Sequence, residues 1–302
     1  MLRESILVYK VVLWGLGALY NKMLNIIRYN EDRNQVKIAA VTANILPKMR
    51  TLDGYPVVLP SELNQIEYEY IIVLNEKWYF DIINEAVNKY KICRDKFISY
   101  KVFWIPNLNF EEYIWLKNSK ISIISNNCWG GIAYSNLGLE CLSPFKNCFL
   151  LDADYITVVN QLELYLSYNL VFSHWDIDVH NNQHYPVMKL GDVYIHFNHA
   201  SGIEEAEETW ERRKKRLNYD NIFIEMYTED PKIEKDFSKI DQYNKKVCFV
   251  PWRAKYNSSM KLELYTGHKE FYQTVNRSAG LSGLKYDLVK LLLYGKRVLR
   301  YG

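Results

Sequence analysis

The stretch ISIISNNCWGGIAYSNLGL, residues 121–139, is the most informative part of this chain for its fold. Its isoleucine-rich start predicts a strand over 121–125, and two glycines close a polar turn before a helical pattern begins. A strand that ends in such a turn before a helix places the turn at the carboxyl edge of an α/β sheet. Because α/β proteins carry their sites at that edge, we predict a functional site at residues 125–130.

Cys128 is the candidate nucleophile of this turn by its position, and backbone N–H groups at the helix start would form an oxyanion hole. Two alternatives stay open. Cys128 is a small core residue beneath a tight turn, or the turn binds a ligand without chemistry. The residues expected to contact substrate here are Ser125, Asn126, Asn127, Trp129 and Gly130.

A nucleophile needs a base within hydrogen-bond reach, and the segment LGDVYIHFNH offers His196 and His199. On a continuous strand Asp192 would lie about 13 Å from His196, too far to orient it. Asn198 would lie about 7 Å from His196 and help to shape the same pocket. The alternative is a core histidine with a backbone partner.

The segment EEAEETWERRKKRLNYDN, residues 204–221, predicts a highly charged helix. Arg213 on this helix would meet a phosphate or a sugar carboxylate through its guanidinium group. Asn221 comes just before the apolar run IFIEM and is expected to join a polar cluster at the sheet edge. The alternative for the helix is a solvated charged face.

The N-terminal part follows a nucleotide-binding plan. VYKVVLW predicts a strand, Gly15 and Gly17 a turn, and the following residues a helix, with further strands and helices alternating as in a parallel sheet. Both glycines would let the backbone approach the phosphate of a nucleotide or nucleotide-sugar. Tyr20 replaces the third glycine of the NAD fingerprint, and Asn44 stands where a ribose-binding acid is expected, which argues against NAD. The alternative is a tight turn without a ligand.

Several segments carry a resemblance to known families. GYPVVLPSEL and YEYIIVLN resemble parts of the Rossmann-type N-terminal domains of bacterial polysaccharide-modifying enzymes. SNNCWGG, YPVMKLGDVYIHFNH and EEAEETWERRKKRLNYDNIFIEM together resemble a bacterial family of unknown function, number 1919, whose members are often labelled exopolysaccharide biosynthesis proteins. That resemblance covers roughly residues 119–250 and carries no catalytic assignment with it.

The chain is therefore expected to have two α/β domains. Residues 1–118 would form a Rossmann-like parallel sheet, and residues 119–302 a second α/β domain with a mixed sheet. The resemblance implies a role in surface polysaccharide or exopolysaccharide biosynthesis. As an enzyme, the protein would transfer an acyl or other small group to a sugar. The alternative is a protein that binds a glycan or nucleotide-sugar without chemistry.

Composition excludes other classes. A formal net charge of +3 is too small to indicate nucleic-acid binding. The five cysteines are widely spaced without a C-x-x-C pair, so we predict neither a disulfide framework nor a cysteine zinc site, as in a cytoplasmic protein. The C-terminal segment LKYDLVKLLLYGKRVLRYG predicts a basic helix that docks on the core or lies on an anionic membrane.

The segment SHWDIDVHNNQHYP brings four potential metal ligands into alternation. On a strand these side chains would share one face and bind a divalent ion. The same alternation is typical of a half-exposed hairpin, which is the interpretation we prefer, with no metal. The four residues are His174, Asp176, Asp178 and His180.

Overall fold

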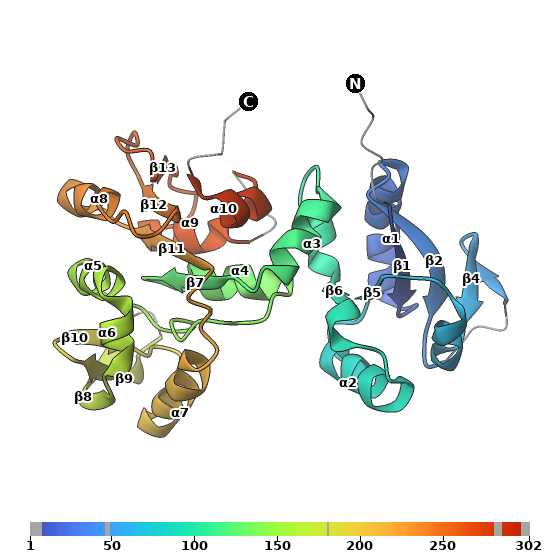
Figure 1. Ribbon diagram of the computed structural model, residues 1–302, viewed down its shortest axis with the longest axis horizontal. Helices are drawn as coiled ribbons and strands as arrows, with labels where there is room; N and C mark the ends of the chain where they lie inside the picture. The colour runs from blue at the N-terminus through green and yellow to red at the C-terminus, as the bar shows by residue number, and fades with distance from the viewer. Residues whose placement is uncertain (1–7, 46–48, 180, 281–285, 297–302) are drawn as a thin grey trace. The chain divides into compact units, whose positions relative to one another are not determined.

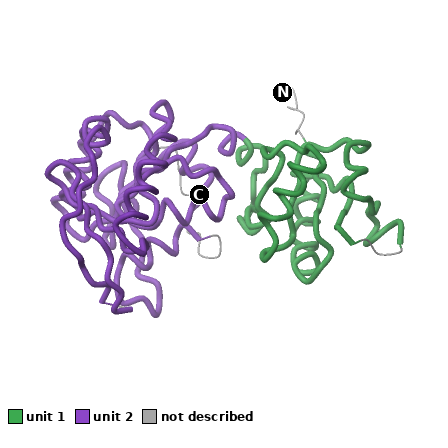
Figure 2. The backbone as a smooth tube through the Cα atoms, turned by 90° about the horizontal axis from the view of Figure 1, so that it is seen from below, with its two compact units in different colours: residues 1–114 green, residues 115–302 purple. Residues whose placement is uncertain are grey.

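The computed structural model describes residues 8–45, 49–179, 181–280 and 286–296. The chain divides into two compact units, residues 1–114 and 115–302 (Figure 2). Each unit combines helices with a largely or wholly parallel sheet, so the chain is α/β in both halves. The two units meet in sequence within α3 (Phe110–Asn118).

Unit 1 contains a six-stranded sheet with the order β3-β4-β2-β1-β5-β6 (Figure 1). Neighbouring strands are parallel except for β3 and β4, which pair antiparallel. The last four residues of the central strand β1 are all buried, as expected of a parallel strand covered on both faces. The strands are β1 (Tyr9–Trp14), β2 (Val36–Thr42), β3 (Thr51–Leu52), β4 (Tyr55–Val58), β5 (Tyr70–Val73) and β6 (Phe97–Ser99). The helices are α1 (Ala18–Asp32), α2 (Tyr79–Tyr90) and the 3-10 turns η1 (Pro60–Gln65), η2 (Arg94–Lys96) and η3 (Tyr100–Trp104).

The carboxyl end of β1 lies where the strand order of unit 1 reverses. The chain runs outward from β1 through β2 to β4 and then returns to β5 on the other side of β1. Gly15 follows β1 with φ +122°, and a Cβ there would lie 2.8 Å from the carbonyl oxygen of Leu74, just after β5. Only glycine fits this backbone conformation and this close approach.

The apolar segment FISYKVFWIP, residues 97–106, forms only a short strand at its start. β6 ends at Ser99, whose hydroxyl accepts a hydrogen bond from the backbone N–H of Lys101 at 3.3 Å. This side-chain bond begins η3 in place of a longer strand.

Unit 2 contains two separate sheets. A parallel sheet has the order β13-β12-β11-β7, and an antiparallel meander has the order β10-β9-β8 (Figure 1). The mixture of strand directions in this unit is thus divided between two sheets. The strands are β7 (Ser122–Ser125), β8 (Leu170–Asp178), β9 (Gln183–Leu190), β10 (Val193–His196), β11 (Ile222–Tyr227), β12 (Lys245–Val250) and β13 (Ser259–Lys261). The helices are α4 (Trp129–Leu137), α5 (Asp152–Asn160), α6 (Leu162–Ser167), α7 (Ile203–Lys214), α8 (Pro231–Ser238), α9 (Phe271–Ser278) and α10 (Leu288–Tyr294).

Alternate residues of β11 separate the two faces of the parallel sheet. Ile224 and Met226 pack into a core that also takes residues from α5, α7, α8 and the meander. Phe223 points to the other face and stacks on Trp129 of α4, with ring centroids 5.9 Å apart. Because side chains alternate along a strand, Glu225 faces the same side as Phe223, toward α4.

The C-terminal helix α10 packs inside unit 2. Its buried residues are Leu288, Val289, Leu291 and Leu292, so its apolar face packs within the unit. Residues 297–302, which carry the last basic side chains, lie outside the described residues. Among the described helices, none combines the length and the hydropathy that crossing a membrane requires.

Candidate functional site

The predicted strand–turn–helix forms at the expected residues. β7 ends at Ser125 and α4 begins at Trp129. The side-chain oxygen of Asn127 accepts the backbone N–H of Trp129 at 2.6 Å, and the Ser125 hydroxyl accepts that of Gly130 at 3.1 Å. Both N–H groups are bonded within the turn, so neither is free to contribute to the oxyanion hole expected at the helix start.

Cys128 and His199 lie together at this edge of the parallel sheet. The Cys128 Sγ atom is 3.4 Å from Nε2 of His199, which follows β10. Cys128 is partly buried and His199 is exposed, so the pair is reachable from solvent. Burial, followed by the nearby Glu225 carboxyl, raises the pKa of the Cys128 thiol to about 11. The thiol is therefore neutral at rest, contrary to the lowered pKa that an imidazole neighbour alone would produce.

The polar residues before Cys128 build the turn instead of lining an open site. Asn126 is 1% exposed and bonds both backbone groups of Tyr227 at the end of β11, at 3.0 and 3.1 Å. Its amide also donates to Asp152 at 3.4 Å. Asn127 is 4% exposed and Ser125 1% exposed, so neither side chain is free to meet a ligand.

Trp129 and Gly130 are also core residues. Trp129 is fully buried, and its indole N–H donates to the Tyr286 hydroxyl at 2.9 Å. A Cβ on Gly130 would lie 2.6 Å from the Ser125 hydroxyl oxygen, so glycine allows α4 to start directly over β7. Of the turn residues expected to contact substrate, none presents an exposed side chain.

Glu225 is the residue of this site that the sequence analysis did not identify. It is fully buried, and Asn127 donates to its two carboxyl oxygens at 3.1 and 3.2 Å. Burial raises the pKa of Glu225 to about 8, while the bonds from Asn127 and Ser125 lower it. The sequence does carry a signal for this residue, a single acid inside the apolar run IFIEM. An acid buried in such a strand must be protonated or hydrogen-bonded.

His196 has partners other than Cys128. Its Nδ1 atom lies 3.7 Å from a carboxyl oxygen of Asp176 and 3.5 Å from the Tyr185 hydroxyl, which in turn donates to Asp176 at 3.0 Å. Its ring stacks on Phe149 with centroids 4.4 Å apart. Burial lowers the pKa of His196, and the Asp176 charge opposes that effect. As expected, Asp192 does not orient this histidine, because it accepts the hydroxyl of Tyr165 at 2.6 Å.

A short backbone link joins the two histidine neighbourhoods. Phe149 and His196 exchange backbone hydrogen bonds of 3.0 and 2.9 Å, and the N–H of Leu150 donates to the carbonyl of Asn126 at 3.1 Å. The backbones of Asn126 and His196 are thus about two strand spacings, or roughly 10 Å, apart.

Asn198, between the two histidines in sequence, is half-buried, and its Oδ1 atom is buried without a hydrogen-bond partner among the described residues.

Arg213 and Asn221 have structural contacts. Arg213 donates to the carbonyl of Lys146 at 2.6 Å. Asn221 precedes β11, so it lies at the amino edge of the sheet, opposite to Cys128. There it donates to the carbonyl of Ser119 at 2.8 Å and accepts from Lys245 at 2.7 Å. The polar cluster expected around Asn221 therefore forms at the wrong edge to join the site.

The described residues contain no group of three or more potential metal ligands. Asp176 instead bonds Tyr185, and the Ser173 hydroxyl lies 3.0 Å from Nδ1 of His174. β8 and β9 form the expected hairpin around these residues. His180 lies outside the described residues.

In unit 1 the residues expected to bind a nucleotide, Gly15, Gly17 and Asn44, lie at the carboxyl edge of the sheet. The side chain of Asn44 is hydrogen-bonded to other residues of the unit. The Asn44 side chain accepts the Trp14 indole N–H at 3.2 Å and donates to Glu85 at 2.8 Å. Gly17 precedes α1 in open space, since a Cβ there would have no neighbour within 4 Å. The backbone at Gly17 is thus the part of this edge that a ligand could approach, whereas Gly15 is closed off by the carbonyl of Leu74.

A family model for a domain of unknown function, DUF1919, matches residues 99–292, more than half of the chain. The chain belongs to the DUF1919 family. A second family model, described as the N-terminal part of C2185-like proteins, matches residues 7–98. The DUF1919 segment contains Cys128, Glu225 and both histidines, whereas the C2185-like segment contains Gly15, Gly17 and Asn44.

A relative of this DUF1919 protein is an uncharacterised protein of Haemophilus influenzae, 36% identical over 137 residues. The match covers 45% of the chain and 64% of the relative. Neither the DUF1919 description nor this relative assigns an activity. The chemistry must therefore come from the residues of the site.

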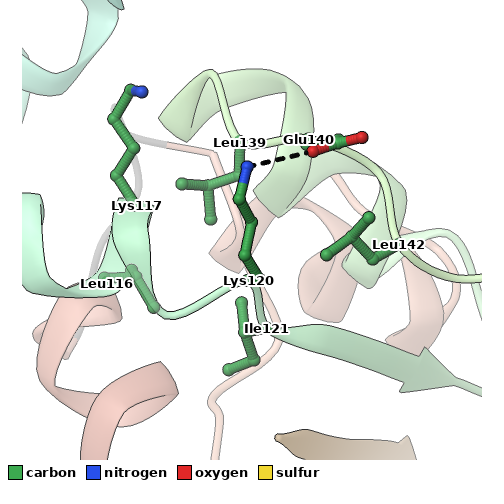
Figure 3. A pocket seen from close by; sticks show the side chains of 7 residues that line it. All are labelled: Leu116, Lys117, Lys120, Ile121, Leu139, Glu140 and Leu142. Atoms are coloured by element: carbon green, nitrogen blue, oxygen red, sulfur yellow. Dashed lines mark hydrogen bonds and ion pairs between the residues drawn. The ribbon is translucent and has the colours of Figure 1, made fainter. Parts of the chain in front are cut away.

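The DUF1919 segment also contains a shallow hollow, away from the Cys128 turn (Figure 3). Lys120 crosses it to form an ion pair with Glu140 at 3.2 Å. The hollow has room for no more than a water molecule. It lies beside Ile121, before the amino end of β7, whereas Cys128 follows the carboxyl end, so it does not belong to the candidate site.

Proposed function

We propose that this DUF1919 protein is a group-transfer enzyme of surface-polysaccharide biosynthesis in which Cys128 carries an acyl group between a donor and a sugar. The observation that supports the transfer is the 3.4 Å contact between the Cys128 Sγ atom and Nε2 of His199 at the carboxyl edge of the sheet. Covalent catalysis requires at least a nucleophile and a base within hydrogen-bond reach of each other. The assignment to polysaccharide assembly rests on the family resemblance alone.

The proposed reaction proceeds in two balanced steps. His199 accepts the thiol proton as Sγ attacks the carbonyl carbon of an activated acyl donor, and the leaving group departs with that proton. An acceptor hydroxyl of a sugar then gives its proton to His199 and attacks the acyl-thioester, which restores the Cys128 thiol. Because the raised pKa keeps the thiol neutral at rest, the proton transfer accompanies the attack instead of preceding it.

For unit 1 we propose a Rossmann-like role in binding a nucleotide or nucleotide-sugar. The support is the glycine turn at the point where the strand order reverses, where α/β sheets bind such ligands. The phosphate would approach the backbone between Gly15 and Gly17 at the start of α1.

Acyl transfer to the protein tests the first proposal without knowledge of the natural donor. The full chain is incubated with acetyl-CoA and, separately, with p-nitrophenyl acetate, and acetylated peptides are located by mass spectrometry. We expect a hydroxylamine-sensitive acetyl group on Cys128 and its absence in Cys128→Ala. In His199→Gln the initial rate should fall by about tenfold or more.

Cys93 supplies the matched control, because it is an exposed free cysteine in unit 1. Cys93→Ala should leave acylation of Cys128 unchanged. Acylation of Cys93 in place of Cys128, or equal rates in wild type and His199→Gln, would count against the proposal.

The second candidate is a protein that binds a glycan or nucleotide-sugar without chemistry. The raised pKa of Cys128 favours it, because a neutral, partly buried thiol is a weak nucleophile. In that case no acyl-cysteine forms from either donor, and Cys128→Ala binds nucleotide-sugars in calorimetry as the wild type does.

A further inference from the structure

Glu225 is a buried carboxyl group directly beside the turn that carries Cys128. In the parallel register of β11 and β7 it lies opposite Ser125, the last residue before the turn. Its side chain faces α4, and it is 0% exposed. A carboxyl group in such a place needs either hydrogen-bond donors or a proton to be tolerated.

Asn127 connects this carboxyl to the backbone of Cys128. The Asn127 amide nitrogen donates to both carboxyl oxygens of Glu225, and its amide oxygen accepts the N–H of Trp129 at 2.6 Å. The Asn127 side chain is thus held at both ends, and Cys128 is the residue between the two anchored positions. The backbone of Cys128, whose Sγ atom lies 3.4 Å from Nε2 of His199, is thus held on both sides.

We infer that Glu225 is a positioning residue that holds Cys128 through Asn127 and limits the formation of the Cys128 thiolate through its own charge. The inference deepens the proposed function and rests on it in so far as Cys128 is the nucleophile. At neutral pH burial keeps Cys128 a neutral thiol that reacts with His199 as base, and above pH 8 the Glu225 anion opposes the thiolate that would otherwise form.

The electrostatics around Glu225 support this inference. Its donors, Asn127 and Ser125, are neutral, and its pKa of about 8 leaves the carboxyl mostly protonated at pH 7. Above pH 8 it becomes an anion that disfavours any nearby negative charge. The titratable groups whose pKa values Glu225 raises come from the turn, α5, β11 and β12, and they are Cys128, Tyr155, Tyr227 and Cys248.

The test is the rate at which iodoacetamide alkylates Cys128 in the full chain between pH 6.5 and 9.5, followed by peptide mass spectrometry. Glu225→Gln keeps an acceptor for Asn127 but cannot ionise. We expect the ratio of the Glu225→Gln rate to the wild-type rate to be near one below pH 7 and about threefold or more above pH 9. If the role of Glu225 were purely structural, the ratio of the two rates would be the same at every pH.

Glu234→Gln is the matched control. Glu234 is equally buried, but its carboxyl accepts from Trp252 at 2.8 Å and from the backbone of Lys255 at 3.1 Å, away from the Cys128 turn. Its ratio to wild type should stay near one at every pH. A pH-independent ratio for Glu225→Gln, or the same rise in both variants, would overturn the inference.

The wild-type chain provides a second measurement if Glu225→Gln does not fold. The logarithm of the alkylation rate should rise with unit slope below pH 7 and with a smaller slope around pH 8, where Glu225 ionises. A constant unit slope through that range would also overturn the inference. Alkylation needs no acyl donor, so this result is independent of whether the acyl-transfer test succeeds.

Discussion

At the scale of single residues, the candidate site depends on a buried acid that is neutral at physiological pH. The raised pKa of Glu225 means that the folded state holds a proton that the unfolded chain has already released. Stability should therefore fall as the pH rises from about 4.5 to about 8 and level off above that window. The slope from this group is about 1.4 kcal/mol per pH unit.

We expect Glu225→Gln to remove this slope, because an amide does not titrate. The free energy of unfolding, measured in urea at pH 5 and at pH 8, should differ less between the two pH values in the variant than in the wild type. Glu234→Gln shows what the exchange of a buried carboxyl for an amide does elsewhere in the same unit. A larger pH difference in Glu225→Gln than in the wild type would contradict the assigned protonation.

The neighbourhood of His196 gives a second prediction for single residues. Burial holds the pKa of His196 below its usual value of 6.5, and the Asp176 carboxylate partly offsets this. Removing that charge in Asp176→Asn should lower the pKa further, so the imidazole titrates at a more acidic pH. NMR titration of the imidazole C–H signals measures the midpoint.

Asp192→Asn is the control for this titration, because Asp192 is bonded to Tyr165 and not to His196. Its midpoint should match that of the wild type. If Asp192→Asn moved the His196 midpoint more than Asp176→Asn did, the assignment of Asp176 as the partner would be wrong.

At the scale of secondary-structure elements, the junction of β7 and α4 depends on a close approach at Gly130. An added Cβ would meet the Ser125 hydroxyl at 2.6 Å and a methyl group of Ile123 at 2.9 Å. We expect Gly130→Ala to lower the free energy of unfolding by about 1–3 kcal/mol, because neither strand atom can move away easily. It should also slow acylation of Cys128, since α4 would start in a shifted position.

Gly131→Ala is the matched substitution at the next residue of the same helix. Its Cβ would lie 3.2 Å from a side-chain carbon of Lys146, which can rotate away. Urea unfolding should show a stability within about 1 kcal/mol of the wild type, since alanine also favours the helix. If both variants lost the same free energy of unfolding, the close contact between the start of α4 and β7 at Gly130 would be wrong.

At the scale of the whole molecule, each unit has buried apolar residues of its own and a carboxyl edge of its own parallel strands. Each parallel sheet also has a glycine-containing turn after a strand, at Gly15 in unit 1 and at Gly130 in unit 2. Each edge carries one of the two proposals, ligand binding in unit 1 and acyl transfer in unit 2.

We expect unit 1 not to bind NAD tightly in the full chain. Asn44 is engaged by Trp14 and Glu85, and Tyr20, in the place of the third glycine, is 1% exposed and donates to Asp53 at 3.0 Å. Calorimetry with NAD should therefore show no submicromolar Kd. A submicromolar Kd would show that the interpretation of Asn44 and Tyr20 is wrong, whereas nucleotide-sugar binding is compatible with it.

The sequence by itself determined several elements of this protein, because their signals are local. Apolar runs and glycine turns predicted β1, β7 and α4, and the alternation of strands and helices predicted α/β architecture in both halves. The spacing along one strand also showed that Asp192 could not orient His196. These inferences need only the repeat of a strand or a helix, which nearby residues define.

Only the tertiary structure decided which residues meet. Glu225 reaches Asn127 across 98 positions of sequence, and Cys128 reaches His199 across 71. Both Asn221 and Cys128 were expected near one polar sheet edge. Cys128 follows β7 and Asn221 precedes the parallel neighbour β11, so they lie at opposite edges of the sheet. Strand order, register and burial set these contacts, and they arise from packing of the whole unit, which no local pattern encodes.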